Sequence, residues 1–229
     1  MEYAAQPAEV ARPESGFLQR VFMWMFMGLL VTGGTAAAIG SSDQLLTDLT
    51  ENPLILLGVI AAQLGLVFFI SFRINSISPT TATALFLVYA ATVGVTFALI
   101  FELYTAQSIF TTFLITAGMF GALAAWGALT DMDLSKLGAI AFMALIGLIL
   151  ATIVNIFWAN ETLYWITTYA GVAIFAALTA YDMQKLNKIS KEGLTGEAEG
   201  RAAIMGALAL YLDFINLFLF LLRIFGRSR

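Results

Sequence analysis

GALALYLDFINLFLFLLRIFG, residues 206–226, is apolar enough to lie in a lipid bilayer, yet Asp213 stands in its middle. An ionised carboxylate at the bilayer centre costs at least about 2.5–3.5 kcal/mol on insertion scales, so this acid is expected to face a bundle interior and to have a partner. Acids inside a membrane mark functional sites by default. The alternative is a protonated Asp213 with a purely structural role, hydrogen-bonded to a neighbouring helix, with Asn216 one turn further along.

The composition is that of an integral membrane protein. Of the 229 residues, 60% are hydrophobic and 11% are charged, whereas soluble domains are about 45–50% apolar and about 25% charged. The chain has no cysteine and no histidine, which excludes disulfides, thiol nucleophiles and zinc–thiolate sites together with the usual proton shuttle. Any pH response near neutrality must therefore come from carboxylates. We expect no enzymatic activity, no cofactor and no binding of nucleic acid.

Seven apolar runs are each close to the roughly 20 residues that a helix needs to cross a bilayer. The first twenty residues are polar and lack the features of a signal peptide, so they predict a short cytoplasmic tail. Short connections leave no room for a separate soluble domain, and a single transmembrane domain over 21–225 is expected. Its predicted helices span 21–39, 54–72, 81–101, 107–129, 137–158, 162–182 and 205–225.

The fold class predicted from these runs is an all-α, seven-transmembrane-helix bundle with a short central seventh helix. The sixth predicted helix ends at Asp182, near the membrane surface. A seventh helix that began at 202 would place Asp213 about 16 Å deep, at 1.5 Å per residue, and out of reach of Asp182. Contact between the two acids therefore requires a seventh helix that begins nearer 207 and is shielded by protein rather than lipid.

The distribution of charge predicts the orientation in the membrane. Basic residues fall at one set of helix ends, and the opposite connections carry only acids, so the positive-inside rule places the N-terminus in the cytoplasm. One conflict remains, because Arg223, Arg227 and Arg229 lie outside if the last segment crosses fully; either that segment is re-entrant or the rule fails there. The basic residues are Arg12, Arg20, Arg73, Lys136, Lys185, Lys188, Lys191 and Arg201, and the opposing acids are Asp43, Asp48, Glu51, Glu102 and Glu161.

Three small residues, Ala117, Gly121 and Ala125, recur at intervals of four in the predicted helix 107–129. Small residues at this spacing let helices approach each other closely in lipid. We interpret this stripe as a helix-packing face.

Two further charged residues are candidates for a site with Asp213. Asp182, in LTAYDMQKL, is either an interfacial acid beside Lys185 or a partner of Asp213. Arg73, in FISFRINSISP, is either an ordinary surface anchor or a partner of Asp182, which is predicted on the same side. Two carboxylates that share a proton respond to pH without histidine, and their oxygens suit Ca²⁺.

Three blocks resemble the bacterial branch of the Bax inhibitor-1 (transmembrane BAX inhibitor motif) family: the segment from FLITAGMFGALAAWGALTDMDLSK to VNIFW, then AALTAYDMQKL, then MGALALYLDFINLFLFLLRIFG. The similarity extends over residues 17–229. It implies a pH-sensitive calcium leak channel of the inner membrane, in which Asp182 and Asp213 form the pH-sensing, Ca²⁺-binding pair. It also implies that Arg73 latches this site. Some relatives are described as modulators of a membrane protease, which makes such a protease a candidate partner.

Three other readings compete with the channel. An intramembrane aspartyl protease is disfavoured because the second acid lies in LYLD rather than GxGD, and the four prolines, at 7, 13, 53 and 79, give no Pro-Ala-Leu signature. A retinal protein is excluded because the last apolar segment has no lysine. The remaining alternative is a regulator that transports nothing and binds a membrane protease or a stress-response partner through its charged loop 185–201 and termini. We expect a monomer in either case.

Overall fold

The computed structural model describes residues 15–227 and contains eight α-helices and one 3₁₀ turn within that range. Seven of these helices are long and apolar enough to cross a membrane, which confirms the predicted all-α membrane bundle. The elements are α1 (Ser15–Gly40), α2 (Asp43–Glu51), α3 (Pro53–Arg73), η1 (Ile74–Ser76), α4 (Pro79–Leu103), α5 (Ala106–Leu129), α6 (Ser135–Trp158), α7 (Glu161–Lys191) and α8 (Gly196–Phe225).

Side-chain caps in the connections fix where most of these helices begin. Asn52 and Ser78 cap α3 and α4, and each is followed by a proline at the first helical position, where the missing N–H costs nothing. The side chains of Thr105 and Asn160 also cap α5 and α7, although no proline follows them. The local sequence therefore sets the helix starts even though the apolar runs carry no strong periodicity.

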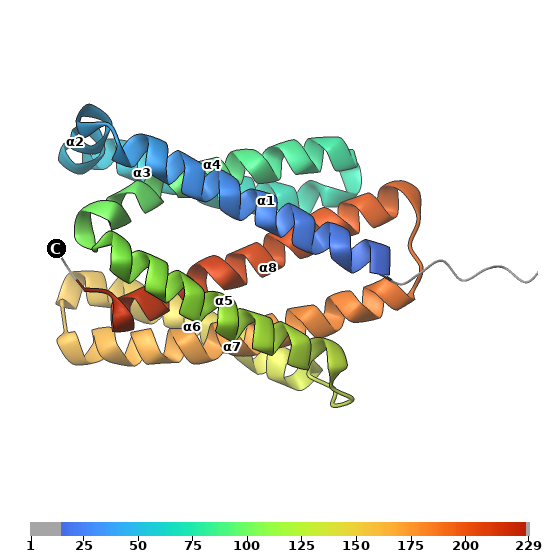
Figure 1. The fold of residues 1–229 in the computed structure, drawn as a ribbon. Helices are drawn as coiled ribbons and strands as arrows, with labels where there is room; N and C mark the ends of the chain where they lie inside the picture. The colour runs from blue at the N-terminus through green and yellow to red at the C-terminus, as the bar shows by residue number, and fades with distance from the viewer. Residues whose placement is uncertain (1–14, 228–229) are drawn as a thin grey trace, which may run out of the picture.

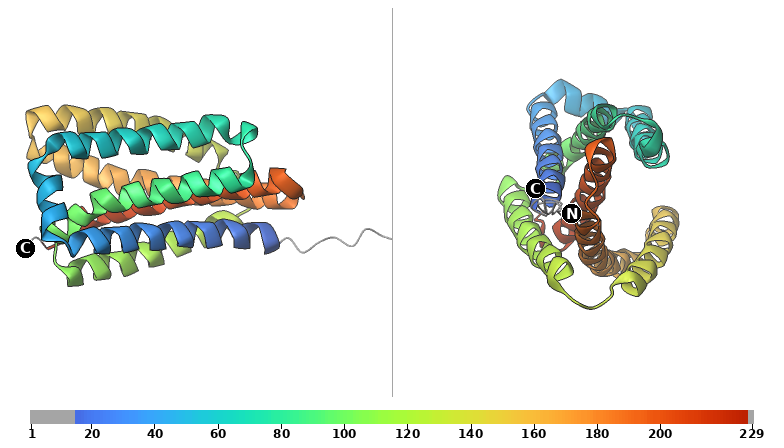
Figure 2. Two further views of the ribbon diagram at one scale, coloured as in Figure 1. Left: turned by 90° about the horizontal axis from the view of Figure 1, so that it is seen from above. Right: turned by 90° about the vertical axis from the view of Figure 1, so that its right-hand side faces the viewer.

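Helix α8 lies at the centre of the bundle and is its most buried spanning helix. It packs against α1, α4, α5 and α7, while α3 lies outside against α4, and α6 lies outside against α7. Figures 1 and 2 show α8 inclined through the middle, with α3 and α4 on one side of it and α6 and α7 on the other. The central position predicted for the last helix is confirmed.

The central helix is not short, which corrects the prediction of a helix over 205–225. It begins at Gly196 and runs for 30 residues. The additional turns are polar: Glu197 pairs with Arg201 at 3.0 Å, one turn apart, and Glu199 pairs with Arg20 of α1 at 3.2 Å. Ion pairs at helical spacing stabilise exposed helix, so the helix continues beyond its apolar part.

A hydrogen-bonded chain joins α8 to α1 and α4 inside the apolar core. The hydroxyl of Thr32 donates to the carbonyl oxygen of Ala90 at 2.9 Å, and the hydroxyl of Tyr211 lies 2.6 Å from the Thr32 oxygen. Because the Thr32 hydrogen is committed to Ala90, Tyr211 is the donor in the second bond. The ring of Tyr211 also meets Phe86 edge to face, with centroids 5.5 Å apart. These contacts fix the position of α8 between its neighbours.

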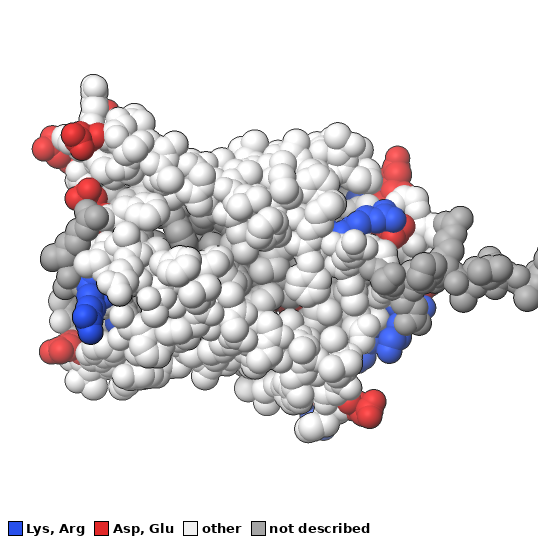
Figure 3. All heavy atoms as spheres, viewed as in Figure 1, with Lys and Arg blue, Asp and Glu red and all other residues white. Residues whose placement is uncertain are grey.

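Charged side chains gather at the two ends of the bundle and leave an uncharged belt between them (Figure 3). Helix α8 begins at the end of the bundle where α1 begins and finishes at the opposite end, so it crosses the full length of the bundle and is not re-entrant (Figure 1). The short helix α2, which was expected to be only a connection, lies at the end where α8 finishes. It buries Leu46 and Leu49 and exposes its acids.

The stripe Ala117, Gly121 and Ala125 does not pack as predicted. Gly121 and Ala125 are exposed, and a Cβ atom added to Gly121 would meet nothing within 4 Å. The buried face of α5 carries Thr112, Thr116, Phe120, Ala124 and Gly127 instead. The close approach occurs at Gly127, where a Cβ atom would collide with the carbonyl group of Ala180 in α7.

Candidate functional site

Asp213 lies in the central helix and is almost completely removed from solvent, with 4% of its surface exposed. Its Oδ2 atom is buried and has no hydrogen-bond partner among the described residues. A buried carboxyl oxygen without a partner is costly, so it needs a functional or structural explanation. Asp213 is therefore the centre of the candidate site.

Asp182 is the acid that lies opposite Asp213. Two contacts, one on each side of Asp182, define the register of the antiparallel helices α7 and α8. Leu186 of α7 meets Gly206 of α8, and the rings of Phe175 and Phe220 stack with centroids 5.9 Å apart. Asp182 and Asp213 fall between these two contacts at matching positions. The two carboxyl groups are close enough to interact electrostatically, although no direct hydrogen bond joins these two described residues.

The depth of Asp182 differs from the sequence expectation. We expected the sixth spanning helix to end at this residue, but α7 continues to Lys191, nine residues or about 14 Å further at 1.5 Å per residue. The helix continues because residues 183–191 include no proline or glycine, and six of them are buried or partly buried against the bundle. Asp182 is thus half-buried inside the bundle and can meet Asp213 without a shortened last helix.

Asn216 does not serve as the partner of Asp213. Its side-chain nitrogen donates to the carbonyl oxygen of Leu212, one turn earlier in the same helix, at 2.8 Å. The hydrogen bond on which a purely structural Asp213 would have depended is therefore not formed by this residue.

Thr112 is a second buried polar group that sequence analysis missed. It lies on α5, which packs against both α7 and α8, and its Oγ1 atom is buried without a partner in the described part of the chain. Thr116, one turn away, is equally buried and donates to the Thr112 carbonyl oxygen at 2.8 Å. Threonine is common in apolar helices, so the sequence does not single out Thr112 and Thr116. Only the fold shows that both side chains are buried.

Arg73 ends α3 and is exposed. Among residues 15–227 it forms no ion pair, and α3 and α7 lie on opposite sides of α8 (Figure 2). The structure therefore does not bring Arg73 to Asp182, and the latch stays a prediction. The basic side chain close enough to interact with Asp182 here is Lys185, on the same helix.

The loop between α5 and α6 is fixed to α7 close to Asp182. The buried side chain of Gln184 donates to the carbonyl oxygen of Met132 at 2.7 Å and accepts from the backbone nitrogen of Leu134 at 2.9 Å. In this loop, hydrogen bonds from Ser135 and the charge of Lys188 hold the pKa of Asp133 below its usual value. The acid pair thus lies next to an ordered loop.

As a cation site the pair is sparse. The described residues contain no group of three or more acidic residues that could hold a metal ion. Two carboxylates supply at most four oxygens, whereas Ca²⁺ takes about 6–8, so carbonyl groups or waters would have to complete its coordination. Such a site suits an ion in transit rather than one held permanently.

Comparisons with known proteins cover nearly the whole chain. A family model described as "Inhibitor of apoptosis-promoting Bax1" matches residues 14–229. The inner membrane protein YbhL of Escherichia coli K12 is 45% identical over 225 residues, which is 96% of each chain. Uncharacterized proteins of Borreliella burgdorferi and Deinococcus radiodurans are 43% and 40% identical, over 93% of this chain and 92% and 90% of their own lengths.

Proposed function

The chain belongs to the Bax inhibitor-1 family of membrane proteins, and on that premise we propose that it is a pH-sensitive calcium leak channel of a bacterial inner membrane. The observation that supports this most is Asp213, an acid at the centre of the bundle with a buried oxygen that has no partner among residues 15–227. A purely structural role gives no reason for the second acid, Asp182, to lie opposite it. The name of the relative YbhL supports the inner-membrane location.

The proposed mechanism uses the acid pair both as the sensor and as the ion site. Two interacting carboxylates release their protons in separate steps, so the pair passes through doubly protonated, singly protonated and doubly ionised forms. The singly protonated form keeps one charged ligand for Ca²⁺, whereas full protonation leaves two neutral groups that bind cations poorly. Full protonation should therefore make the leak decline at low pH, and release of the latch described next should make it rise as the pH falls from about 8 toward 6.

Arg73 enters this proposal as a latch. In the ionised state of Asp182, an attraction to Arg73 would draw α3 toward α7 and close the path to the acids, and protonation of Asp182 would release it. Because Arg73 is exposed and unpaired in the present structure, the latched form requires α3 to move.

The test is calcium flux through the purified protein in liposomes. Wild-type protein should pass Ca²⁺ at pH 6–7, and Asp213→Asn should remove the calcium flux and its pH dependence while the protein still folds, because the amide cannot carry the charge. Glu102→Gln, which changes an exposed carboxylate at the end of α4, should behave as wild type. Equal flux in wild type and Asp213→Asn would contradict the role of Asp213 in the leak, and an Asp213→Asn protein that fails to fold would indicate a structural acid.

The second candidate is a regulator that transports nothing and binds a membrane protease or stress-response partner. It is supported by the polar segment where α7 passes into α8, which exposes Lys185, Lys188 and Lys191. The same liposome experiment separates the two functions, because a regulator would give no flux at any pH.

A further inference from the structure

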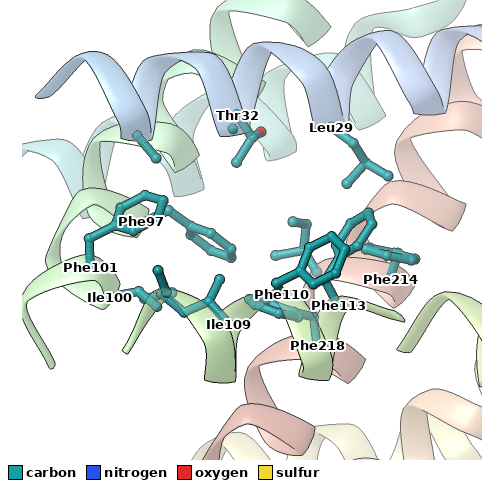
Figure 4. Close-up of a pocket in the computed structure, with 14 residues that line it drawn as sticks. Leu29, Thr32, Phe97, Ile100, Phe101, Ile109, Phe110, Phe113, Phe214 and Phe218 are labelled. Carbon is teal, nitrogen blue, oxygen red and sulfur yellow. The ribbon is translucent and has the colours of Figure 1, made fainter. Parts of the chain in front are cut away.

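A cavity of about 330 Å³ lies in the half of the bundle where α4 ends and α5 begins. Its walls come from α1, α4, α5 and α8, and six of its lining side chains are phenylalanines: Phe97, Phe101, Phe110, Phe113, Phe214 and Phe218. Figure 4 shows Leu29 and Thr32 of α1 facing these rings across one space. Its volume lies at the lower end of the range of about 300–1,000 Å³ for ligand pockets.

The cavity opens sideways, between α1 and α5. These two helices are not among the pairs that pack closely, whereas both pack against α8 behind the cavity. Exposure falls from the mouth inwards: Phe110 is 62% exposed and Gly33 is exposed, while Ala36 and Phe218 are 2% and 5% exposed. The opening therefore lies in the side of the bundle that faces the bilayer.

The lining rejects polar occupants. Of the residues in the described chain that line the cavity, only Thr32 carries a polar side chain, and its hydroxyl is already bonded to Ala90 and Tyr211. A water molecule in a cavity needs about 2–4 polar partners, which these walls do not offer. An unfilled cavity, in turn, deprives its lining atoms of dispersion contacts. The apolar lining therefore favours a hydrocarbon as the occupant of the cavity.

The depth of the cavity identifies the leaflet. Ile109 and Phe113 lie three and seven residues after Ala106, so they are about 4.5–10.5 Å from the start of α5 at 1.5 Å per residue. That range falls within one half of a hydrocarbon core about 30 Å thick. At the same end, Arg227 bonds through its backbone to Thr105 and Ser108, and its exposed side chain has no ion-pair partner within residues 15–227. It supplies a cation at the level of lipid phosphates.

We propose that this cavity is a binding site for one acyl chain of a bilayer phospholipid, which enters between α1 and α5 from the leaflet at the α2 end. The opening in the lipid-facing side, the hydrocarbon walls and the depth together favour this occupant over a soluble ligand. A second copy of the chain would cover the mouth but would leave the interior at Phe218 unfilled. The site does not depend on the proposed calcium leak, because it uses neither Asp182 nor Asp213.

The experiment uses the full-length protein in liposomes of phosphatidylethanolamine and phosphatidylglycerol that contain a phospholipid with a diazirine in its acyl chain. After illumination, mass spectrometry maps the labelled residues. Phe218 and Phe175 form a matched pair, since each is 5% exposed and each stacks on another ring at 5.9 Å, but only Phe218 lines the cavity. We expect several-fold more label at Phe218. Equal label at the two residues would overturn the proposal.

Two adjacent glycines give a second, independent comparison. Gly33 and Gly34 are both exposed and both have room for a side chain, but only Gly33 lines the cavity. Gly33→Leu should reduce the label at Phe218 to the level seen at Phe175, and Gly34→Leu should leave it unchanged. Undiminished label at Phe218 in folded Gly33→Leu would refute the site, as would a dimer whose Phe218 is unlabelled in the wild type. If Gly33→Leu does not fold, the wild-type comparison still decides.

Discussion

Removing one partner from the hydrogen-bonded chain of Ala90, Thr32 and Tyr211 should cost very different amounts depending on which partner is removed. In Tyr211→Phe the donor disappears, but the Thr32 hydroxyl still donates to the Ala90 carbonyl oxygen. In Thr32→Val the Tyr211 hydroxyl stays in place, 0% exposed, with no acceptor. Both substitutions break the bond between Tyr211 and Thr32. Thr32→Val also removes the bond to Ala90 and leaves the buried Tyr211 hydroxyl without a partner, whereas Tyr211→Phe leaves no donor unpaired.

The expected sizes follow from this asymmetry. Tyr211→Phe loses one hydrogen bond and leaves no buried donor unpaired. Such a loss costs about 0.5–1.5 kcal/mol, and measured values inside membrane bundles average about 0.6 kcal/mol. In Thr32→Val the buried Tyr211 hydroxyl has no hydrogen-bond partner to offset the free energy of removing it from water. This substitution should therefore destabilise the protein by about 1–3 kcal/mol. The double variant Thr32→Val/Tyr211→Phe removes the orphan and should cost less than the sum of the single variants, by about 1 kcal/mol.

The assay is reversible unfolding in mixed micelles with rising dodecyl sulfate, followed by the fluorescence of the four tryptophans. Tyr169→Phe is the control, because this tyrosine is 58% exposed and its hydroxyl takes part in no hydrogen bond of the described chain. The order of cost should be Tyr169→Phe, Tyr211→Phe and then Thr32→Val. Equal costs for Tyr211→Phe and Thr32→Val, or strict additivity in the double variant, would refute the assignment of donor and acceptor.

Three further outcomes are expected. Gly127→Ala should destabilise the protein by about 1–3 kcal/mol in the same unfolding assay, because the added methyl group meets the Ala180 carbonyl. Gly121→Ala should be neutral or stabilising by up to about 1 kcal/mol. Similar values for both variants would contradict the packing described. Under the proposed latch, liposomes with Arg73→Ala should leak Ca²⁺ at pH 8, where wild type is closed, and a tight Arg73→Ala would show that the latch is wrong even if the channel is right. A single cysteine in place of Leu45, easily introduced in a cysteine-free chain, should react with an impermeant reagent from outside the cell, and reaction only from the cytoplasm would overturn the orientation.

The number of spanning helices could be predicted from the sequence because bilayer thickness is a local constraint on chain length. Each apolar run had to be about 20 residues long, and the predicted starts at 54 and 81 lie within two residues of Pro53 and Pro79, where α3 and α4 begin. The ends at Lys191 and Gly196 were misjudged because polar helix outside the membrane core has no such length constraint. Its stability comes instead from ion pairs such as Arg201 with Glu197.

Which face of each helix packs could not be predicted in the same way. In a soluble protein the buried face is the apolar one, but lipid is as apolar as a protein core, so hydropathy does not distinguish the two faces. The stripe Ala117, Gly121, Ala125 and the stripe Thr116, Phe120, Ala124 are both compatible with packing, and only the second is buried. The cavity between α1 and α5 is undetectable in the sequence for the same reason.

The sequence by itself determined that Asp213 lies within a membrane-spanning helix, because the apolar run on both sides of it is long enough to cross the bilayer. Only the tertiary structure decided its surroundings. The antiparallel register of α7 and α8, set by contacts such as Leu186 with Gly206, places Asp182 opposite Asp213, while Arg73 stays exposed at the end of an outer helix. These relations depend on how long helices slide and tilt against one another, which is fixed by side-chain packing across residues distant in the chain and not by any local property of the sequence.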